Sequence, residues 1–381
     1  MTLYSKSDNI NPWGDIMKLE QLLKERNLPD LMSKEEMKKI LLDNEYGYVP
    51  DTPYGVYYSE PKILHGGLLG RTVQYSTVDL SVTTPYGVHT FPVHRILHND
   101  GQKRPFFVFL NFTAQIHDFI YPVEEVAEGG FDVLYVKHND ITTDDRDFTN
   151  GIAGVLLPNG QETDTTCGKI RLWAWALSRV LDYAETVPTL DMDNAAVVGH
   201  SRLGKTALVA GMTDSRFKYV ISNDSGCSGA ALTRGSMGLT GEIGPFGESS
   251  ETIKRIVSFF PHWFCKKYQE YAKTNIPDIF DQHFLVASIA PRFAYVASAT
   301  MDDWADPVSE FLTCVAATPA YEKLGLKGLV CNDEIPKGGE FFHEGRIGYH
   351  KTHGAHMISR HDWHRFMDYI KLHKDETVDN K

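Results

Sequence analysis

The sequence predicts an α/β protein with a doubly wound, mostly parallel sheet. Compact apolar runs, typical of strands that are buried on both faces, alternate with segments of helical periodicity. These apolar runs lie at residues 106–112, 131–136, 195–199, 219–222 and 293–299. Because parallel strands need crossover connections, this alternation favours a sheet covered by helices on both faces.

The first 100 residues predict helices followed by a β-hairpin. Apolar residues at helical spacing indicate one helix near the start: Met17, Leu19, Leu22 and Leu23. The polar stretch 33–36, followed by apolar Met37 and Ile40, predicts the beginning of a second helix. Alternation of apolar and polar residues over 70–95, interrupted by Pro85-Tyr86-Gly87, predicts the hairpin.

The remainder of the chain predicts the doubly wound sheet. Residues 170–183 are rich in apolar side chains and are expected to form a crossover helix. Residues 234–282 form a longer insertion, glycine-rich at first and aromatic later, which we interpret as a cap. We therefore predict one domain over 1–381, with 1–100 as an N-terminal extension and 234–282 as a cap-like insertion.

Charge and composition disfavour several classes of partner. The 381-residue chain has a net charge of −12, which disfavours nucleic acid and anionic membranes. No stretch approaches the roughly 20 apolar residues of a membrane helix, and no secretory signal pattern begins the sequence. Five scattered cysteines are typical of a reduced protein, so we expect a cytoplasmic location. The oligomeric state stays open.

Residues 199–206 read Gly-His-Ser-Arg-Leu-Gly-Lys-Thr, and this octet fits two unrelated chemistries. By spacing it satisfies the phosphate-loop pattern, in which backbone amides and a lysine hold a nucleotide phosphate. That interpretation needs a metal-coordinating aspartate after a strand, for which Asp224 is the candidate. Equally, Ser201 lies between an apolar strand and an apolar helix, as the nucleophile of a serine hydrolase does.

A serine hydrolase needs an acid and then a histidine after the nucleophile, and the chain supplies them in that order. Ser201 would attack an ester carbonyl after His356 has taken its proton, since a free hydroxyl is a weak nucleophile. Asp224 and Asp302 each follow a predicted strand, and either could hold the imidazole. Other histidines lie near His356, but their spacing does not match the usual zinc patterns. We therefore expect neither a metal nor a cofactor.

Two cations, Arg202 and Lys205, occupy the first turn of the predicted helix after Ser201. A helix N-terminus is the positive end of the helix dipole, so we expect Asp224, Asp302 or the substrate to compensate them. The backbone N–H of Arg202 is a natural donor to an oxyanion, and its guanidinium could assist. The loop at 113–115 is our candidate for a second donor.

Several segments together resemble the glucuronoyl esterases, α/β-hydrolases that cleave esters of uronic acid in plant cell walls. The octet matches their nucleophile motif Gly-x-Ser-Arg-x-Gly-Lys, and residues 223–226 look like their Gln-Glu-Ser-Gly. Similar segments follow in the same order at 281–283, 290–292 and 303–304. The resemblance covers most of residues 105–370 and implies an α/β-hydrolase fold with an oligosaccharide or small-molecule ester as substrate.

The resemblance also implies roles for individual residues. It favours Asp224 as the acid, whereas Asp302 holds the more usual place in hydrolase folds. It implies that Lys205 contacts sugar hydroxyls and that Trp304 stacks on a sugar face. With two aromatic residues of the expected cap, the predicted substrate-binding residues are Lys205, Trp304, Trp263 and His262.

The sequence departs from the family beside both ends of the triad. His200 stands where the family's cysteine precedes the nucleophile, and Met357 rather than cysteine follows His356. Residues 259–263 are apolar where a substrate-binding glutamate of the family would fall. A related bacterial group that looks like acetylxylan esterases keeps Gly-His-Ser-Arg-Leu-Gly-Lys, so an acetylated sugar is the alternative substrate.

Overall fold

A computed structural model describes residues 18–157, 162–234 and 250–378. Its centre is one sheet with the strand order β1-β3-β4-β6-β5-β7-β8-β9-β11-β10, and β2 pairs with β3. The strands are β1 (Gly55–Tyr58), β2 (Lys62–Leu68), β3 (Val73–Thr84), β4 (Gly87–His98), β5 (Arg104–Asn111), β6 (Asp132–Lys137), β7 (Leu190–His200), β8 (Tyr219–Asn223), β9 (Phe293–Ala299), β10 (Phe341–Phe342) and β11 (Ile347–Thr352). From β6 to β11 neighbouring strands are parallel, as the sequence predicts.

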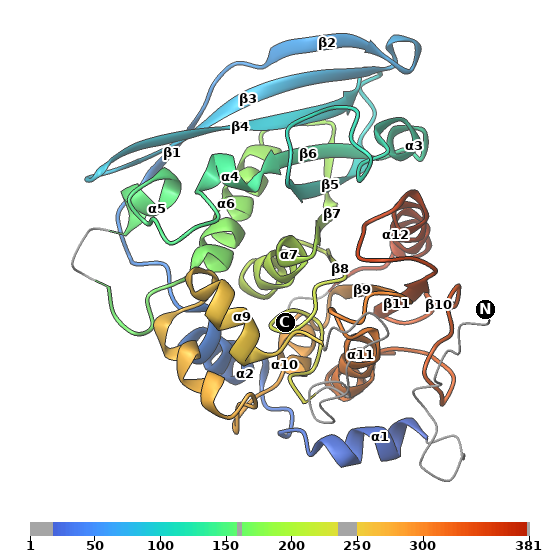
Figure 1. Cartoon of the computed structure of the whole chain (residues 1–381). Helices are drawn as coiled ribbons and strands as arrows, with labels where there is room; N and C mark the ends of the chain where they lie inside the picture. The colour runs from blue at the N-terminus through green and yellow to red at the C-terminus, as the bar shows by residue number, and fades with distance from the viewer. Residues whose placement is uncertain (1–17, 158–161, 235–249, 379–381) are drawn as a thin grey trace, which may run out of the picture.

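Helices cover both faces of the parallel part (Figure 1). The helices are α1 (Leu19–Arg26), α2 (Lys34–Leu41), η1 (Leu42–Tyr46), η2 (Leu69–Arg71), α3 (Val123–Glu128), α4 (His138–Ile141), α5 (Gly151–Leu156), α6 (Lys169–Ala184), α7 (Arg202–Thr213), α9 (Ile253–Phe259), η3 (Pro261–Trp263), η4 (Lys266–Lys273), α10 (His283–Ala287), α11 (Pro307–Glu322) and α12 (Arg360–His373). One apolar cluster joins α6, α7, α10 and α11 to one face, and a second joins α3 and α12 to the other. Along β5, Val108 belongs to the first cluster and Phe107 and Phe109 to the second, which explains the unbroken apolar run.

The N-terminal predictions are confirmed where residues are described. The second helix begins at Ser33 with a capping box, in which the Ser33 hydroxyl and the Glu36 carboxylate satisfy each other's backbone amides. The predicted hairpin is β3 and β4, and β4 joins it antiparallel to β6 of the main sheet. Met17 and residues 235–249 of the expected cap lie outside the described residues. Of that insertion, the structure describes α9, η3 and η4, which lie beside α2 and α10 in Figure 1.

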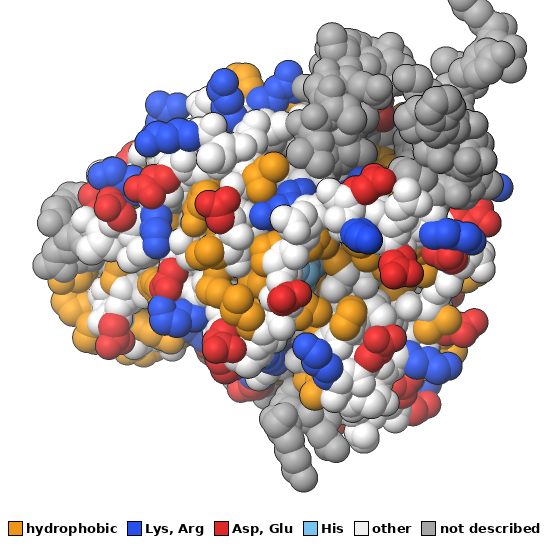
Figure 2. Space-filling model, turned by 90° about the horizontal axis from the view of Figure 1, so that it is seen from below, with side chains coloured by type: hydrophobic (Ala, Val, Ile, Leu, Met, Phe, Trp, Pro, Cys, Tyr) orange, Lys and Arg blue, Asp and Glu red, His pale blue; other side chains and the backbone are white. Residues whose placement is uncertain are grey.

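Acidic and basic side chains are interspersed over the face that Figure 2 shows, with hydrophobic side chains gathered between them. Among the residues that the structure describes, no helix combines the length and apolarity needed to cross a membrane.

A buried glutamate connects the N-terminal helices to the segments around the site. Glu45, in η1, is fully buried and accepts hydrogen bonds from Gln282 Nε2 at 3.0 and 3.2 Å. Its backbone carbonyl accepts from the N–H of Cys265 in the cap, at 2.9 Å. Beside it, the Tyr46 hydroxyl donates to the carbonyl of Ser228, in the loop after β8, at 3.1 Å. Burial raises the pKa of Glu45 to about 7, so the folded chain keeps this carboxyl group neutral at acidic pH.

We predict that Glu45→Gln flattens the decrease in stability between about pH 4.5 and pH 7. The unfolded chain loses the Glu45 proton near its ordinary pKa, whereas the folded chain holds it up to about pH 7. Wild-type stability therefore falls as pH rises through this window, by on the order of 3 kcal/mol at most. Urea unfolding at pH 5 and pH 8 measures the difference. Glu20→Gln, at an exposed position of α1, is the matched control, and an equal slope in both variants would contradict the assignment.

Candidate active site

The nucleophile candidate Ser201 occupies a sharp turn between β7 and α7. Its φ and ψ are 58° and −130°, a conformation that costs energy for a residue with a side chain. A Cβ on Gly199 would lie 2.1 Å from the Leu203 carbonyl oxygen, and one on Gly204 would lie 3.1 Å from the Asn223 carbonyl oxygen. The close approach of α7 to β7 and β8 thus requires glycine at 199 and favours it at 204. This explains why the second glycine of the motif comes one position late.

Ser201, His356 and Asp302 form one chain of hydrogen bonds. His356 Nε2 lies 2.9 Å from Ser201 Oγ, and His356 Nδ1 lies 2.6 Å from Asp302 Oδ2. Asp302 follows β9, and His356 follows β11, so two neighbouring parallel strands carry them to the same edge of the sheet as Ser201. The buried carboxylate fixes Nδ1–H, which leaves Nε2 as the acceptor for the serine proton.

The preference for Asp224 as the acid is wrong in this geometry. Asp224 Oδ2 accepts from the N–H of Met357 at 3.3 Å, and within the described residues Asp224 Oδ1 has no hydrogen-bond partner. Burial, followed by the charge of Glu310, raises the pKa of Asp224 well above its ordinary value. Glu310 accepts from Ser298 Oγ at 2.6 Å, and burial raises its pKa to about 8. The raised pKa favours the neutral form of Asp224, whereas holding an imidazolium requires an ionised acid.

Asp144, which sequence reasoning missed, holds the Arg202 side chain. Asp144 Oδ2 lies 2.5 Å from Arg202 Nη1, and Oδ1 accepts from His262 Nε2 at 3.0 Å and Trp263 Nε1 at 2.6 Å. The guanidinium carbon also lies 4.9 Å from the centre of the Trp263 ring and 5.5 Å from that of Phe260. Burial alone would raise the pKa of Asp144, but these three donors keep it below its usual value. The sequence signal for Asp144 is the acid-rich loop that follows α4.

Ser201 lies at a cavity of about 250 Å³. Its lining consists of Ser201, Arg202, Lys205, Asp224, Ser225, Gly226, Glu251, Phe260, Trp263, Trp304, Ala305 and His356. Three of the predicted substrate-binding residues, Lys205, Trp263 and Trp304, therefore line the cavity. His262 is not, because its ring is buried and donates to Asp144, and this prediction is corrected. Glu251 was missed: it precedes α9 rather than falling within 259–263.

The Lys205 ammonium is fully engaged at the floor of this cavity. Lys205 Nζ donates to the carbonyl oxygens of Ser225 and Cys227, each at 2.6 Å, and to Glu251 Oε2 at 2.8 Å. Three of the octet's amides are engaged too: Ser201 N–H donates to the Asn223 carbonyl, and Gly204 and Lys205 N–H donate to the Ser201 carbonyl. A phosphate loop needs the lysine ammonium for the phosphate, and here that group is held by three protein acceptors, so this geometry contradicts the phosphate-loop interpretation.

Two other groups considered in the sequence, the histidines near His356 and the loop at 113–115, do not join the site. The histidines around His356 have separate partners: His350 contacts Asp362 and Tyr295, and His364 contacts Glu125. The loop at 113–115 is absent from the cavity lining, so the second oxyanion donor stays unassigned.

A serine, a histidine and an aspartate joined in this order at the edge of a mostly parallel sheet define a serine hydrolase of the α/β-hydrolase class. Residues 159–325 match the family model described as "Glucuronyl esterase, fungi". A carbohydrate esterase from an unknown prokaryotic organism is 37% identical over 66% of this chain and 56% of its own length. A 4-O-methyl-glucuronoyl methylesterase from Hypocrea jecorina is 35% identical over 42% of this chain and 34% of its own length.

Solved structures of related esterases superpose on nearly the whole of this chain. A promiscuous CE15 esterase from a marine bacterial metagenome is 28% identical, with a TM-score of 0.78 over 98% of both chains. A glucuronoyl esterase from Solibacter usitatus is 26% identical, with a TM-score of 0.78 over 97% of this chain and 98% of its own. The chain is thus a relative of the glucuronoyl esterases, a family of carbohydrate ester hydrolases. Its sequence matches span from about a third to just over half of the length of these two curated relatives.

We predict that the two aspartates near His356 differ sharply in their importance. Asp302→Asn should lower kcat for an aryl acetate by about 10³–10⁴-fold, because the imidazole loses its ionised partner. Asp224→Asn should change kcat by less than about tenfold, since asparagine resembles the neutral carboxyl group. Steady-state kinetics of the two variants measures this. A larger loss in the Asp224 variant would reverse the assignment.

We predict that Asp144→Asn lowers kcat/KM for the same ester by about 10- to 100-fold, the cost of losing charge-assisted hydrogen bonds that hold Arg202. Asp164→Asn, which removes an exposed carboxylate beside Lys266, is the matched control and should behave as wild type. Thermal unfolding of both variants separates loss of the site from loss of the fold. Wild-type kinetics in the Asp144 variant would show that Arg202 needs no such support.

Proposed function

We propose that this protein is a serine carboxylic-ester hydrolase that cleaves esters of a uronic acid through an acyl-enzyme. The observation that carries this proposal is the hydrogen bond between Ser201 Oγ and His356 Nε2 beside a cavity that also holds Lys205 and Glu251. The first pair supplies a reactive nucleophile, and the second supplies a carboxylate, held in place by Lys205, that can accept from sugar hydroxyls.

The chemistry follows from the positions of the protons. Ser201 Oγ attacks the ester carbonyl carbon while its proton passes to His356 Nε2, and Asp302 stabilises the resulting imidazolium. Arg202 is the first residue of α7, where a backbone N–H has no intrahelical partner, so it can donate to the oxyanion. The intermediate expels the alcohol, which takes the proton from His356. Water, deprotonated by His356, then attacks the acyl carbon, and the bond to Ser201 Oγ breaks as His356 returns the proton to that oxygen, which releases the free acid.

A uronate as the acyl group fits the composition of the cavity. Glu251 can accept from a sugar hydroxyl, Lys205 Nζ holds its carboxylate in place, and Trp304 offers a half-buried ring that suits the C–H face of a sugar. The glucuronoyl esterase from Sporotrichum thermophile, 19% identical to this chain with a TM-score of 0.65, was solved with methyl 4-O-methyl-β-D-glucopyranuronate. The curated fungal relatives are named for the same kind of ester, which supports this substrate class.

An acetylated sugar is the second candidate. The structural relative described as promiscuous indicates that this scaffold can accept more than one kind of ester. We also propose a cytoplasmic location, supported by five free cysteines, with an oligosaccharide ester as the substrate there.

Ser201→Ala tests the chemistry, and two esters test the substrate. We expect this variant to lose turnover of an aryl acetate and labelling by a serine-directed phosphonate, because both need the nucleophilic oxygen. Its thermal unfolding should match the wild type. Among substrates, the wild type should hydrolyse a benzyl glucuronate ester faster than an acetylated xylo-oligosaccharide. Turnover of only the acetylated sugar would discard the uronate, and undiminished turnover by the Ser201 variant would discard the mechanism.

A further inference from the structure

A second and larger cavity lies at the other end of α7. It measures about 540 Å³ and is bordered by α2, the end of α7, α10 and the end of α11. Ser201 precedes the first residue of α7, whereas Met212 and Thr213, its last two residues, line this cavity. At about 1.5 Å of rise per residue, the helix separates the two sites by about 18 Å. This cavity is therefore no part of the active site.

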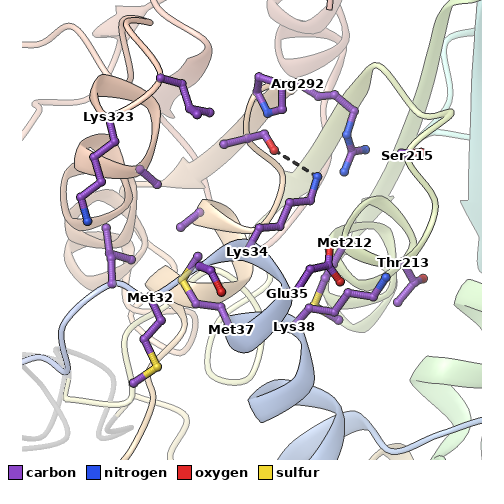
Figure 3. Close-up of a pocket in the computed structure, with 17 residues that line it drawn as sticks. Met32, Lys34, Glu35, Met37, Lys38, Met212, Thr213, Ser215, Arg292 and Lys323 are labelled. Carbon is purple, nitrogen blue, oxygen red and sulfur yellow. Dashed lines mark hydrogen bonds between the residues drawn. The ribbon is translucent and has the colours of Figure 1, made fainter. Parts of the chain in front are cut away.

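Cations dominate the charged groups around this cavity. Its lining includes Lys34, Lys38, Arg292 and Lys323, against the single carboxylate of Glu35. Figure 3 shows Lys34 crossing the middle of the cavity toward Arg292, with Lys38 and Lys323 on opposite sides. Such a concentration of positive charge is unexpected in a chain whose net charge is −12.

The two innermost cations are held by backbone carbonyls rather than by acids. Arg292 is 1% exposed and donates to the carbonyl oxygens of Phe217 at 2.7 Å and Gly211 at 2.6 Å. Lys34 Nζ donates to the carbonyl oxygen of Ala290 at 3.1 Å. An ammonium has three N–H groups, so this bond leaves two that can reach a ligand. Burial, followed by the charge of Arg292, lowers the pKa of Lys34 to about 8, which indicates positive charge without full compensation.

Apart from the cations, Glu35 and three hydroxyl residues (Ser33, Thr213 and Ser215), the wall is apolar. Met37, Met212 and Ala287 are buried at its base, and Leu31 and Leu324 stand nearer the opening. An inorganic anion would contact only the ammonium groups and would leave the apolar wall exposed to water. A ligand with an anionic head and an apolar body would use both, and the volume suits a small organic molecule.

We infer that this cavity binds an amphiphilic organic carboxylate, with its head on Lys34 and its body against Met37 and Met212. The bound carboxylate supplies the negative charge that the surrounding side chains do not. Lys38 and Lys323 raise the local potential from opposite sides of the cavity.

Octanoate is the probe, with octylammonium and acetate as matched ligands. Isothermal titration calorimetry with the full chain should show octanoate binding more tightly than either, because octylammonium lacks the negative charge and acetate lacks the apolar body. Lys34→Met removes the ammonium group, keeps an unbranched side chain one atom shorter, and should weaken octanoate binding about tenfold or more. Lys62→Met, at an exposed position of β2, should leave it unchanged.

A Lys205→Met variant separates this site from the active site, and it should bind octanoate as the wild type does. Carbon-13 labelling of lysine gives a readout that needs no variant: saturation with octanoate should raise the pKa of Lys34, since a bound carboxylate favours the ammonium. Aryl acetate hydrolysis by Lys34→Met should equal that of the wild type. Undiminished octanoate binding by Lys34→Met, equal binding of octylammonium, or loss of binding in Lys205→Met would each overturn the inference.

Discussion

The close contact between α7 and the two strands beneath it is the constraint on which the site depends. Ser201 keeps its positive φ because its N–H is tied to the Asn223 carbonyl at 2.9 Å, while glycine at 199 and 204 lets the helix approach. That strain presents the hydroxyl at the strand end rather than burying it. The same contact brings the loop after β8 over the helix, where its carbonyl oxygens receive the Lys205 ammonium.

Three carboxyl groups lie close to this turn, and their surroundings give them different states. Asp302 touches the imidazole of His356, so its negative charge has a partner when the histidine is protonated. Asp224 and Glu310 are fully buried beside each other, and burial together with mutual repulsion favours their neutral forms. Burial thus disfavours negative charge on the two carboxyl groups that do not contact the histidine.

The sequence was informative about the parts of the site that lie on regular elements. The strands from β5 to β9, the turn at Ser201 and the histidine follow from apolar runs and chain order. Chain order could not choose between Asp224 and Asp302, because both follow strands of the same parallel sheet. Asp144 and Glu251 were missed because each acts on α7 from a loop without periodicity, 58 and 46 residues away. The strand β11, which carries His356 into place, was also missed because its residues are mixed in polarity, although every one is buried.

The two cations of the first turn of α7 show why those loop carboxylates matter. We expected Asp224, Asp302 or the substrate to compensate them. Instead, Arg202 forms an ion pair with Asp144, and Lys205 forms one with Glu251. Each cation at the positive end of the helix thus has its own acid, brought from outside the strands that carry the triad. Because these acids satisfy Arg202 and Lys205 before any ligand binds, the triad acid is left for the histidine alone. The two cations therefore line the cavity without competing with His356 for Asp302.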